Sequence, residues 1–260
     1  MQRDSVLGTL TVALILCVVC SVLVSSAAVG LRPFQEKNKK QFERENILAA
    51  AGYTAEEIKQ GADQLFKNIE TRLIDLDTGE VATDADAETY DQKKAAKDPD
   101  GSVEIPADKA TFGFKRREKY SRVYLLKQSG TLKKVILPIY GKGLWSTLYG
   151  FIALEGDLNT VAGITFYEHK ETPGLGGEVD NPKWKATWNH KLLRDQSGEL
   201  KIEVIKGEVT AGSASAIHQI DGLSGATITS RGVSNAVRYW IADGFGPFLE
   251  KLKVAEGSHG

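Results

Sequence analysis

A chain of 260 residues is long enough for one large domain or two small ones, and its apolar and charged fractions of 42% and 26% are those of a globular protein. The net charge of −1 gives no electrostatic support for a nucleic-acid partner. Both cysteines, Cys17 and Cys20, lie in the first apolar run, which excludes a disulfide framework or a cysteine metal site in the rest of the chain.

The first element expected is a membrane anchor. Residues 6–31 are almost uncharged and strongly apolar, and their core, residues 7–24, is long enough to span a bilayer as a helix. The alternative is a cleaved signal peptide with its cleavage region at residues 25–28, although such a peptide usually has a shorter apolar core. We therefore predict a transmembrane anchor in residues 1–31 and a domain in residues 32–260. Most basic side chains near the anchor follow it, so the positive-inside rule alone predicts a cytoplasmic domain.

Two helices are expected after the anchor. Residues 33–51 have a helical pattern, and Gly52 is a stop signal. Thr54 and Glu57 then match a capping box, in which the threonine hydroxyl caps the helix and the glutamate side chain reaches back. The helix opened by this box is expected to bury one apolar stripe, consisting of Ile58, Ala62 and Leu65, with Ile69 as a further candidate.

The middle of the chain is rich in short strands joined by tight turns. Four strand pairs are predicted: residues 73–76 with 80–83, 122–127 with 132–137, 151–154 with 161–167, and 200–205 with 207–210. Residues 84–108 are polar and should form a short helix, a turn and a loop. Helices lie at the two ends of the chain, so we predict an α+β fold: one N-terminal transmembrane helix, then a mainly antiparallel sheet flanked by helices. A Rossmann domain is not expected, and no Gly-x-Gly-x-x-Gly turn indicates an NADH site.

Two glycine-rich clusters interrupt this pattern. Residues 140–145 place two glycines beside a lysine and Trp145, where a flat ring and a phosphate would fit; the ordinary interpretation is a turn with Trp145 in the core. Residues 169–177 contain a Pro-Gly turn followed by two flexible glycines. His169 and Glu171 would make a metal pair, but no third ligand stands at a suitable spacing, so no metal site is expected.

A third cluster, residues 221–230, packs small and hydroxyl side chains into one turn. Ser224, Thr229 and Ser230 are plausible N-caps of the helix that follows, and Gly225 permits a positive φ or the close approach of a ligand. The N-terminus of this helix favours a nearby anion such as a phosphate, although an ordinary capped junction has the same composition. The buried stripe of the helix is expected at Val233, Ala236, Val237, Trp240 and Ile241.

The run Asp-Gly-Leu-Ser-Gly-Ala-Thr at residues 221–227 resembles the flavinylation motif D-G-x-S/T-G-A-T/S. In proteins with that motif, a flavin transferase joins FMN through its phosphate to the hydroxyl of the last residue, which is Thr227 here. The three clusters together, including H-x-E-T-P-G-L-G in the second, are similar over nearly the whole chain to the C subunit of the Na⁺-translocating NADH:quinone oxidoreductases. The G subunit of Rnf complexes shares the flavin domain and is the alternative family.

The resemblance implies an electron-carrying subunit of a membrane complex that oxidises NADH, reduces ubiquinone and pumps Na⁺, with FMN joined to Thr227 by a phosphoester. It implies other subunits as partners, a flavin transferase during maturation, and a single-pass protein of the bacterial inner membrane with a periplasmic domain, in contrast to the charge rule. Trp145 and Leu175 would pack the isoalloxazine ring, and Asp221 would serve recognition by the transferase. The rest of the flavin would be held by Thr172, Gly174, Ser224, Gly225, Ala226 and Thr229. An anchored, non-catalytic module that binds a soluble anion is the alternative of another class.

Overall fold

Helix α1 (Val6–Ala50) is the first element of the computed structural model, which describes residues 6–257. The chain divides into two compact units, residues 1–43 and 44–260. Among the described residues, α1 is the one helix long and apolar enough to cross a membrane, with a mean hydropathy of 2.7 in its most apolar window. The prediction of a separate helix from residue 33 is wrong, because α1 continues through Pro33. A proline removes one backbone hydrogen bond, and the other bonds of so long a helix keep it continuous.

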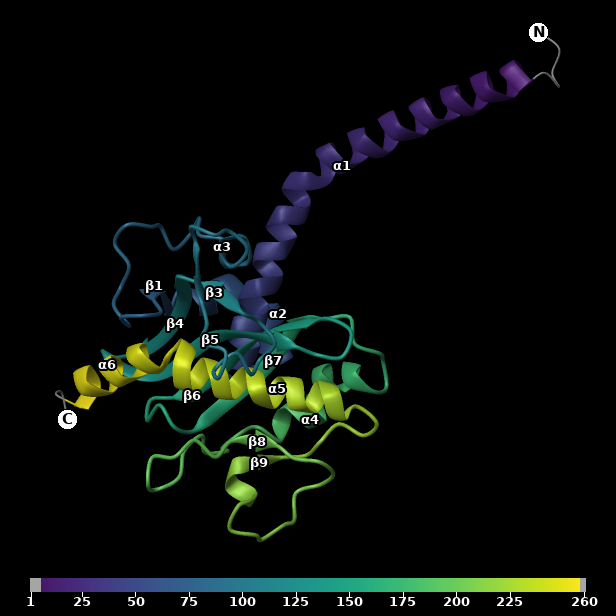
Figure 1. The fold of residues 1–260 in the computed structure, drawn as a ribbon. Coiled ribbons are helices and arrows are strands. Elements are labelled where there is room, and N and C mark those ends of the chain that lie inside the picture. Colours follow the sequence, from purple (N-terminus) through teal and green to yellow (C-terminus); the bar gives the residue numbers. More distant parts are fainter. Residues whose placement is uncertain (1–5, 258–260) are drawn as a thin grey trace. The chain divides into compact units, whose positions relative to one another are not determined.

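A five-stranded sheet forms the centre of the second unit (Figure 1). Its order is β1-β4-β5-β6-β7, and every neighbouring pair is antiparallel. The strands are β1 (Ile69–Asp75), β4 (Tyr120–Gln128), β5 (Thr131–Lys142), β6 (Thr147–Glu155) and β7 (Val161–Glu168). The α+β class and the hairpins around residues 129 and 157 are therefore confirmed. The first glycine-rich cluster is the end of β5 and its turn into β6.

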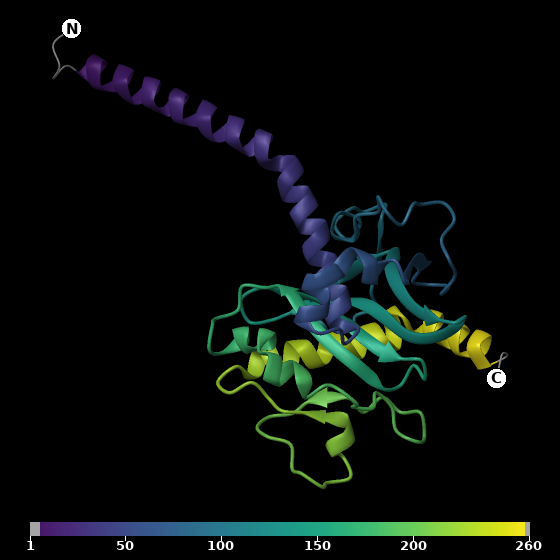
Figure 2. The same cartoon turned by 180° about the vertical axis from the view of Figure 1, so that it is seen from behind.

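Both faces of the sheet are buried. Along β5, Val135 and Leu137 belong to one hydrophobic cluster and Ile136 to another, as the two-residue period of a strand requires. Helices α5 (Thr227–Tyr239) and α6 (Gly246–Gly257) cover the first face (Figure 1), while the end of α1 and helix α2 (Ala55–Phe66) cover the second (Figure 2). The buried stripe predicted for the last cluster is confirmed, since all its members lie in the first core: Val233, Ala236, Val237, Trp240 and Ile241.

The capping box before α2 is confirmed. The Thr54 hydroxyl accepts a hydrogen bond from the amide of Glu57, and the Glu57 carboxylate accepts one from the amide of Thr54 at 2.8 Å. The apolar stripe of α2 is only partly buried against the second core: Ile58, Ala62 and Leu65. The box therefore fixes where the chain leaves α1 and starts α2.

Two of the predicted strand pairs need correction. Residues 200–205 and 207–210 form no hairpin, because β8 (Glu203–Val204) pairs in parallel with β9 (Gln219–Ile220). Residues 73–76 were expected to pair with residues 80–83. Strand β1 pairs instead with β4, and a single bridge, Ile74 to Val81, joins it to the second segment. An alternating pattern identifies a strand but not its partner, since backbone groups are satisfied by whichever strand lies alongside.

The remaining elements are short. They are α3 (Gln92–Ala95), β2 (Ser102–Glu104), β3 (Arg116–Glu118), α4 (Pro182–Ala186), the 3₁₀ turns Gly176–Asp180 and Ala216–His218, and the π-helical turn Trp240–Gly244. Helix α3 is the short helix expected within residues 84–108. Strand β2 lies in the segment predicted as loop and pairs with β3.

Candidate functional site

The start of α5 is the centre of the candidate site. Its first residue is Thr227, which is exposed, and its cap position is Ala226. Ala226 makes no side-chain cap hydrogen bond, so the first amides of the helix lack an N-cap and can donate to an outside acceptor. Gly225 precedes them with a φ of 70°, a conformation that glycine adopts freely. The turn thus presents a hydroxyl beside open donors and the positive end of a helix dipole.

The N-caps predicted for α5 are wrong. Thr229 and Ser230 lie inside its first turn and are buried, while Ser224 lies on the surface before Gly225. The Ser230 hydroxyl accepts from the amide of Leu223 at 2.9 Å, which ties the preceding turn onto the helix. The hydroxyl groups of this segment therefore hold the turn and its neighbours instead of closing the helix end.

Asp221, which precedes the turn before α5, anchors this turn to neighbouring segments through hydrogen bonds. Its carboxylate accepts from the amide of Val209 at 2.6 Å, and its carbonyl oxygen accepts from the indole nitrogen of Trp184 at 2.8 Å. The amide of Gly222 donates to the carbonyl of Gly207 at 2.7 Å. These bonds give Asp221 a structural task that the sequence pattern did not indicate.

Glu171 is the residue that joins three segments of the site. It is 5% exposed, and its Oε1 accepts from the amides of Trp145 at 2.9 Å and Ser146 at 3.1 Å. Its Oε2 accepts from the amide of Leu144 at 3.1 Å and from the hydroxyl of Thr229 at 2.7 Å. Burial acts to raise the pKa of Glu171, but the hydrogen bonds from Thr229 and from the turn amides outweigh it and hold the pKa below its usual range.

Two glycines make room for this carboxylate. A Cβ atom at Gly143 would lie 2.6 Å from Glu171 Oε1. One at Gly176 would lie 2.8 Å from Glu171 Oε2 and 2.6 Å from the Thr229 hydroxyl. Gly143 of the first cluster and Gly176 of the second therefore have the same explanation, which is the close approach of the buried Glu171 side chain. The sequence pattern indicated Glu171 only as a possible metal ligand and gave no sign of this role.

Apolar side chains are exposed around the same place. Trp145 is 70% exposed, so the interpretation that places it in the core is wrong. Leu175 is 43% exposed and lies against Gly225, where a Cβ atom would be 2.8 Å from its Cδ2. Leu144 and Ile228 are also exposed, and neither was predicted. Each is the sequence neighbour of a predicted site residue, Trp145 or Thr227, which is the signal that would have found them.

The loop that carries Leu175 keeps its shape through its own backbone. The carbonyl of Thr172 accepts from the amides of Leu175 at 3.1 Å and Gly177 at 2.9 Å. Thr172 and Gly174 are exposed, and Gly174 has a φ of 75°. The structure therefore brings Leu175, Trp145 and Thr229 together with the start of α5. Thr172 and Gly174 lie on the surface of the same loop.

His169 and Glu171 do not point at a common ligand. His169 Nε2 lies 2.7 Å from a carboxylate oxygen of Asp180, and its Nδ1 accepts from the amide of Glu171 at 3.2 Å. In the part of the chain that the structure describes, no three histidine, cysteine or acidic side chains are grouped to hold a metal ion.

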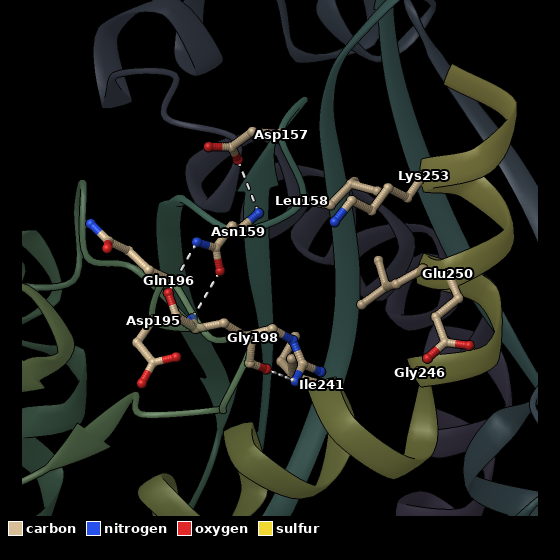
Figure 3. A pocket seen from close by; sticks show the side chains of 12 residues that line it. Asp157, Leu158, Asn159, Asp195, Gln196, Gly198, Ile241, Gly246, Glu250 and Lys253 are labelled. Carbon is tan, nitrogen blue, oxygen red and sulfur yellow. Dashed lines mark hydrogen bonds between the residues drawn. The ribbon is translucent and has the colours of Figure 1, made fainter. Parts of the chain in front are cut away.

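A cleft of about 460 Å³ lies elsewhere in the second unit (Figure 3). It is lined by the turn at Asp157, by the loop at Asp195 and by Glu250 and Lys253 of α6. Ile241 in its wall follows the C-terminal end of α5, whereas Thr227 begins this helix of 13 residues, which is roughly 20 Å long. None of the predicted flavin-site residues lines this cleft.

The fold and the site together define an FMN-binding domain. The profile of the family described as "FMN-binding domain" matches residues 143–242, which run from the β5–β6 turn through α5. Two solved structures share the fold. The first is NqrC of Shewanella oneidensis, with a TM-score of 0.72 and 38% identity over 84% of this chain and 99% of that one. The second is the C subunit of the Na⁺-translocating NADH-quinone reductase from Parabacteroides distasonis, with a TM-score of 0.65 and 30% identity over 84% of this chain and 96% of that one.

Similarity at the level of sequence extends over almost the full chain. The C subunit of the Na⁺-translocating NADH-quinone reductase of Pseudomonas aeruginosa is 49% identical over 98% of this chain and 99% of its own length. Its counterpart in Vibrio vulnificus is 46% identical over 97% of both. The chain therefore belongs to the NqrC family, the C subunits of the Na⁺-translocating NADH-quinone reductases, which are enzyme complexes.

Proposed function

We propose that this chain carries one FMN joined covalently to Thr227 and passes electrons within a Na⁺-translocating NADH-quinone reductase. The observation that carries the proposal is the exposed Thr227 hydroxyl at an uncapped helix N-terminus, inside a family of FMN-binding domains. A phosphoester to Thr227 places the flavin phosphate where the open amides and the dipole of α5 stabilise negative charge.

The ring of the flavin is proposed to lie against Trp145 and Leu175. Both side chains are exposed although they are large and apolar, and an isoalloxazine ring between them would cover that surface. FMN supplies the redox chemistry when it is bound, and the protein positions it and tunes its potential. Thr172, Gly174 and Ser224 are proposed to contact the ribityl chain and phosphate from the surface.

Thr229 acts differently from the sequence-based expectation. Its side chain is 1% exposed and donates to Glu171, so we assign it an indirect part in binding, through the position of Glu171. Ala226 is buried at the cap position, where a small side chain leaves the helix end open. Neither residue needs to touch the flavin to shape its site.

The family and helix α1 support the proposed location. We propose a single-pass protein of the bacterial inner membrane, anchored by the apolar part of α1, with residues 44–260 on the periplasmic side. Other subunits of the reductase, which would oxidise NADH, reduce ubiquinone and move Na⁺, are its partners, and a flavin transferase is its partner during maturation. An NADH site on this chain is not part of the proposal.

The two alternatives fit less well. The relatives named above are C subunits of quinone reductases, with matched lengths, which favours this complex over an Rnf complex. A non-catalytic module that binds a soluble anion would not need large exposed apolar side chains beside the anion site, as at Trp145 and Leu175.

Peptide mass spectrometry tests the attachment. The full chain, coexpressed with a flavin transferase and digested, should give one FMN-sized adduct on the peptide with Thr227. Thr227→Val keeps the shape of the side chain but has no hydroxyl and should give none, whereas Thr227→Ser should keep part of it. Ser224→Ala is the control, because Ser224 is an exposed hydroxyl three residues away and should be dispensable as acceptor. An adduct on Ser224 or no adduct in the wild type would contradict the proposal.

A further inference from the structure

We propose that Glu171 is a positioning residue of the flavin site. Its buried carboxylate fastens the 144–146 turn and the first turn of α5 to the loop that carries Leu175, and so sets how Trp145 and Leu175 face the ring. The inference rests on the proposed function for the identity of what the site holds. We call these hydrogen bonds of the Glu171 carboxylate the clamp. The clamp is a property of the chain and can be measured without flavin.

The two carboxylate oxygens divide the work. Oε1 serves the turn alone, with the amides of Trp145 and Ser146 and, at 3.3 Å, the Ser146 hydroxyl. Oε2 is shared between the turn, through the amide of Leu144, and α5, through the Thr229 hydroxyl. Three consecutive amides directed at one carboxylate fix the orientation of the turn, and with it the exposed indole of Trp145.

A neutral side chain cannot replace this arrangement. Glutamine has one acceptor oxygen and one NH₂ group. The NH₂ group must therefore face either the amides of Trp145 and Ser146, in the place of Oε1, or the amide of Leu144 and the Thr229 hydroxyl, in the place of Oε2. In each case a backbone N–H loses its acceptor in a buried place. All the hydrogen bonds described for Glu171 come from neutral groups, so the carboxylate also brings a negative charge into the wall of the site.

Asp157 provides a matched control. Its carboxylate accepts from the amides of Asn159 and Thr160 and from the Thr160 hydroxyl, which is the same pattern of hydrogen bonds on another turn, although Asp157 is exposed. It lines the cleft of Figure 3. Ile241 lines the same cleft and follows the C-terminal end of α5, whereas Thr227 begins that helix. Asp157→Asn should therefore loosen its own turn and leave the flavin site unchanged.

Amide hydrogen exchange on the full chain made without transferase is the first test. Glu171→Gln should speed exchange at residues 144–146 by roughly tenfold or more, the effect of losing a hydrogen bond to a charged group. Asp157→Asn should do so only at residues 159–160. Unchanged exchange at 144–146 in folded Glu171→Gln would overturn the proposal, whatever the chain is found to bind.

The second test uses the full chain coexpressed with transferase. Glu171→Gln should keep the adduct on Thr227 but shift the visible spectrum of the flavin and raise its midpoint potential, because a negative charge near the ring disfavours added electrons. Asp157→Asn should match the wild type. A loaded Glu171→Gln chain with an unaltered spectrum and potential would overturn the proposal. A wild type without adduct contradicts the proposed function, and the exchange test then decides the clamp.

Thr229 keeps the proposal falsifiable if Glu171→Gln does not fold. Thr229→Val removes the bond between α5 and Glu171 and leaves the turn amides in place. We expect a shifted flavin spectrum with little change in exchange at residues 144–146, and Thr229→Ser should restore the wild-type spectrum. A folded, loaded Thr229→Val chain with the wild-type spectrum would count against the clamp.

Discussion

The contrast between Trp145 and the other tryptophans shows what single residues contribute to this domain. Trp188 and Trp240 are fully buried and belong to the first core, and Trp184 is 7% exposed and bonds to Asp221. Trp145 alone among these four is largely exposed. Burying an aromatic side chain stabilises a fold, and the exposure of Trp145, next to exposed Leu144, is consistent with the ligand surface proposed above.

The two residues proposed to face the flavin ring can be tested one at a time. Trp145→Ala or Leu175→Ala should leave FMN attached to Thr227 but alter its absorption spectrum or midpoint potential, since these side chains would set ring packing and access of water. Ile217→Ala is the control, because Ile217 is 41% exposed, close to the 43% of Leu175, and lies outside the site. A spectrum and a potential that both match the wild type would show that the residue does not contact the ring.

A buried carboxylate away from the site makes stability depend on pH. Glu118 is completely buried, accepts from the Tyr140 hydroxyl at 2.7 Å, and also receives a bond from Gln92. Burial raises the pKa of Glu118 above its usual 4.5, and the hydrogen bonds from Tyr140 and Gln92 only partly oppose this. The folded chain therefore binds this proton more tightly than the unfolded chain. The stabilisation that results is complete at pH values below the pKa of Glu118 in the unfolded chain, and it is lost as the pH rises through the pKa of Glu118 in the folded chain.

Denaturant unfolding at several pH values measures this effect. Relative to Glu118→Gln, which does not titrate, the wild type should lose free energy of unfolding by about 1.4 kcal/mol per pH unit between the unfolded and folded pKa values. Above the folded pKa the difference should become constant. A difference that is independent of pH from the unfolded pKa up to neutrality would show that the pKa of Glu118 is not raised.

At the level of elements, the sheet places the site by letting α5 approach β5 closely. A Cβ atom at Gly232 of α5 would lie 2.1 Å from the carbonyl oxygen of Lys142, and one at Gly141 of β5 would lie 2.6 Å from the Cβ of Ala236. This contact sets the start of α5 next to the turn that follows β5, and the Thr229–Glu171 bond closes the gap. The two glycines are therefore part of the geometry of the site.

Replacing one of these glycines should cost stability in spite of helix propensity. Gly232→Ala gains up to about 1 kcal/mol from propensity in a helix, but the backbone clash should outweigh this and destabilise the domain by roughly 1–3 kcal/mol. Gly30→Ala is the control: a Cβ atom added at Gly30 in α1 would meet nothing within 4 Å beyond the adjoining backbone, so unfolding of the second unit should not change. A Gly232→Ala domain as stable as the wild type would contradict the close packing.

Local patterns predicted those elements whose signals are local. The capping box at Thr54, the hairpins around residues 129 and 157 and the buried stripe after Thr227 all depend on side chains a few residues apart. The sequence does not show that β8 pairs with β9, or that Glu171 bonds to Thr229, because these partners lie far apart in the chain. The failed cap at Thr229 has the same cause, since its hydroxyl bonds to Glu171, whereas the Ser230 hydroxyl accepts from the nearby amide of Leu223 in the preceding turn.

At the level of the whole molecule, α1 should stay on the mature protein. Its apolar window is as hydrophobic as a membrane span and none of it is buried within the chain, as for an anchor or a signal peptide, and the length of the apolar run favours the anchor. Intact mass or amino-terminal sequencing of membrane-extracted protein measures this directly. A mature start near Ala27 or Ala28 would show that the segment is a cleaved signal peptide.

The exposure of Thr227 has a consequence for the order of events in the life of the protein. The proposed acceptor, Thr227, is exposed on the folded domain, and the turn before it is held by hydrogen bonds of Ser230 and Asp221. Folding and attachment of FMN can therefore be separate in time. A folded chain without flavin would be colourless, and it would become yellow once an active transferase and its flavin donor are present. Adding both to purified, folded chain should produce the Thr227 adduct without any unfolding step, whereas a need for denaturant would show that modification precedes folding.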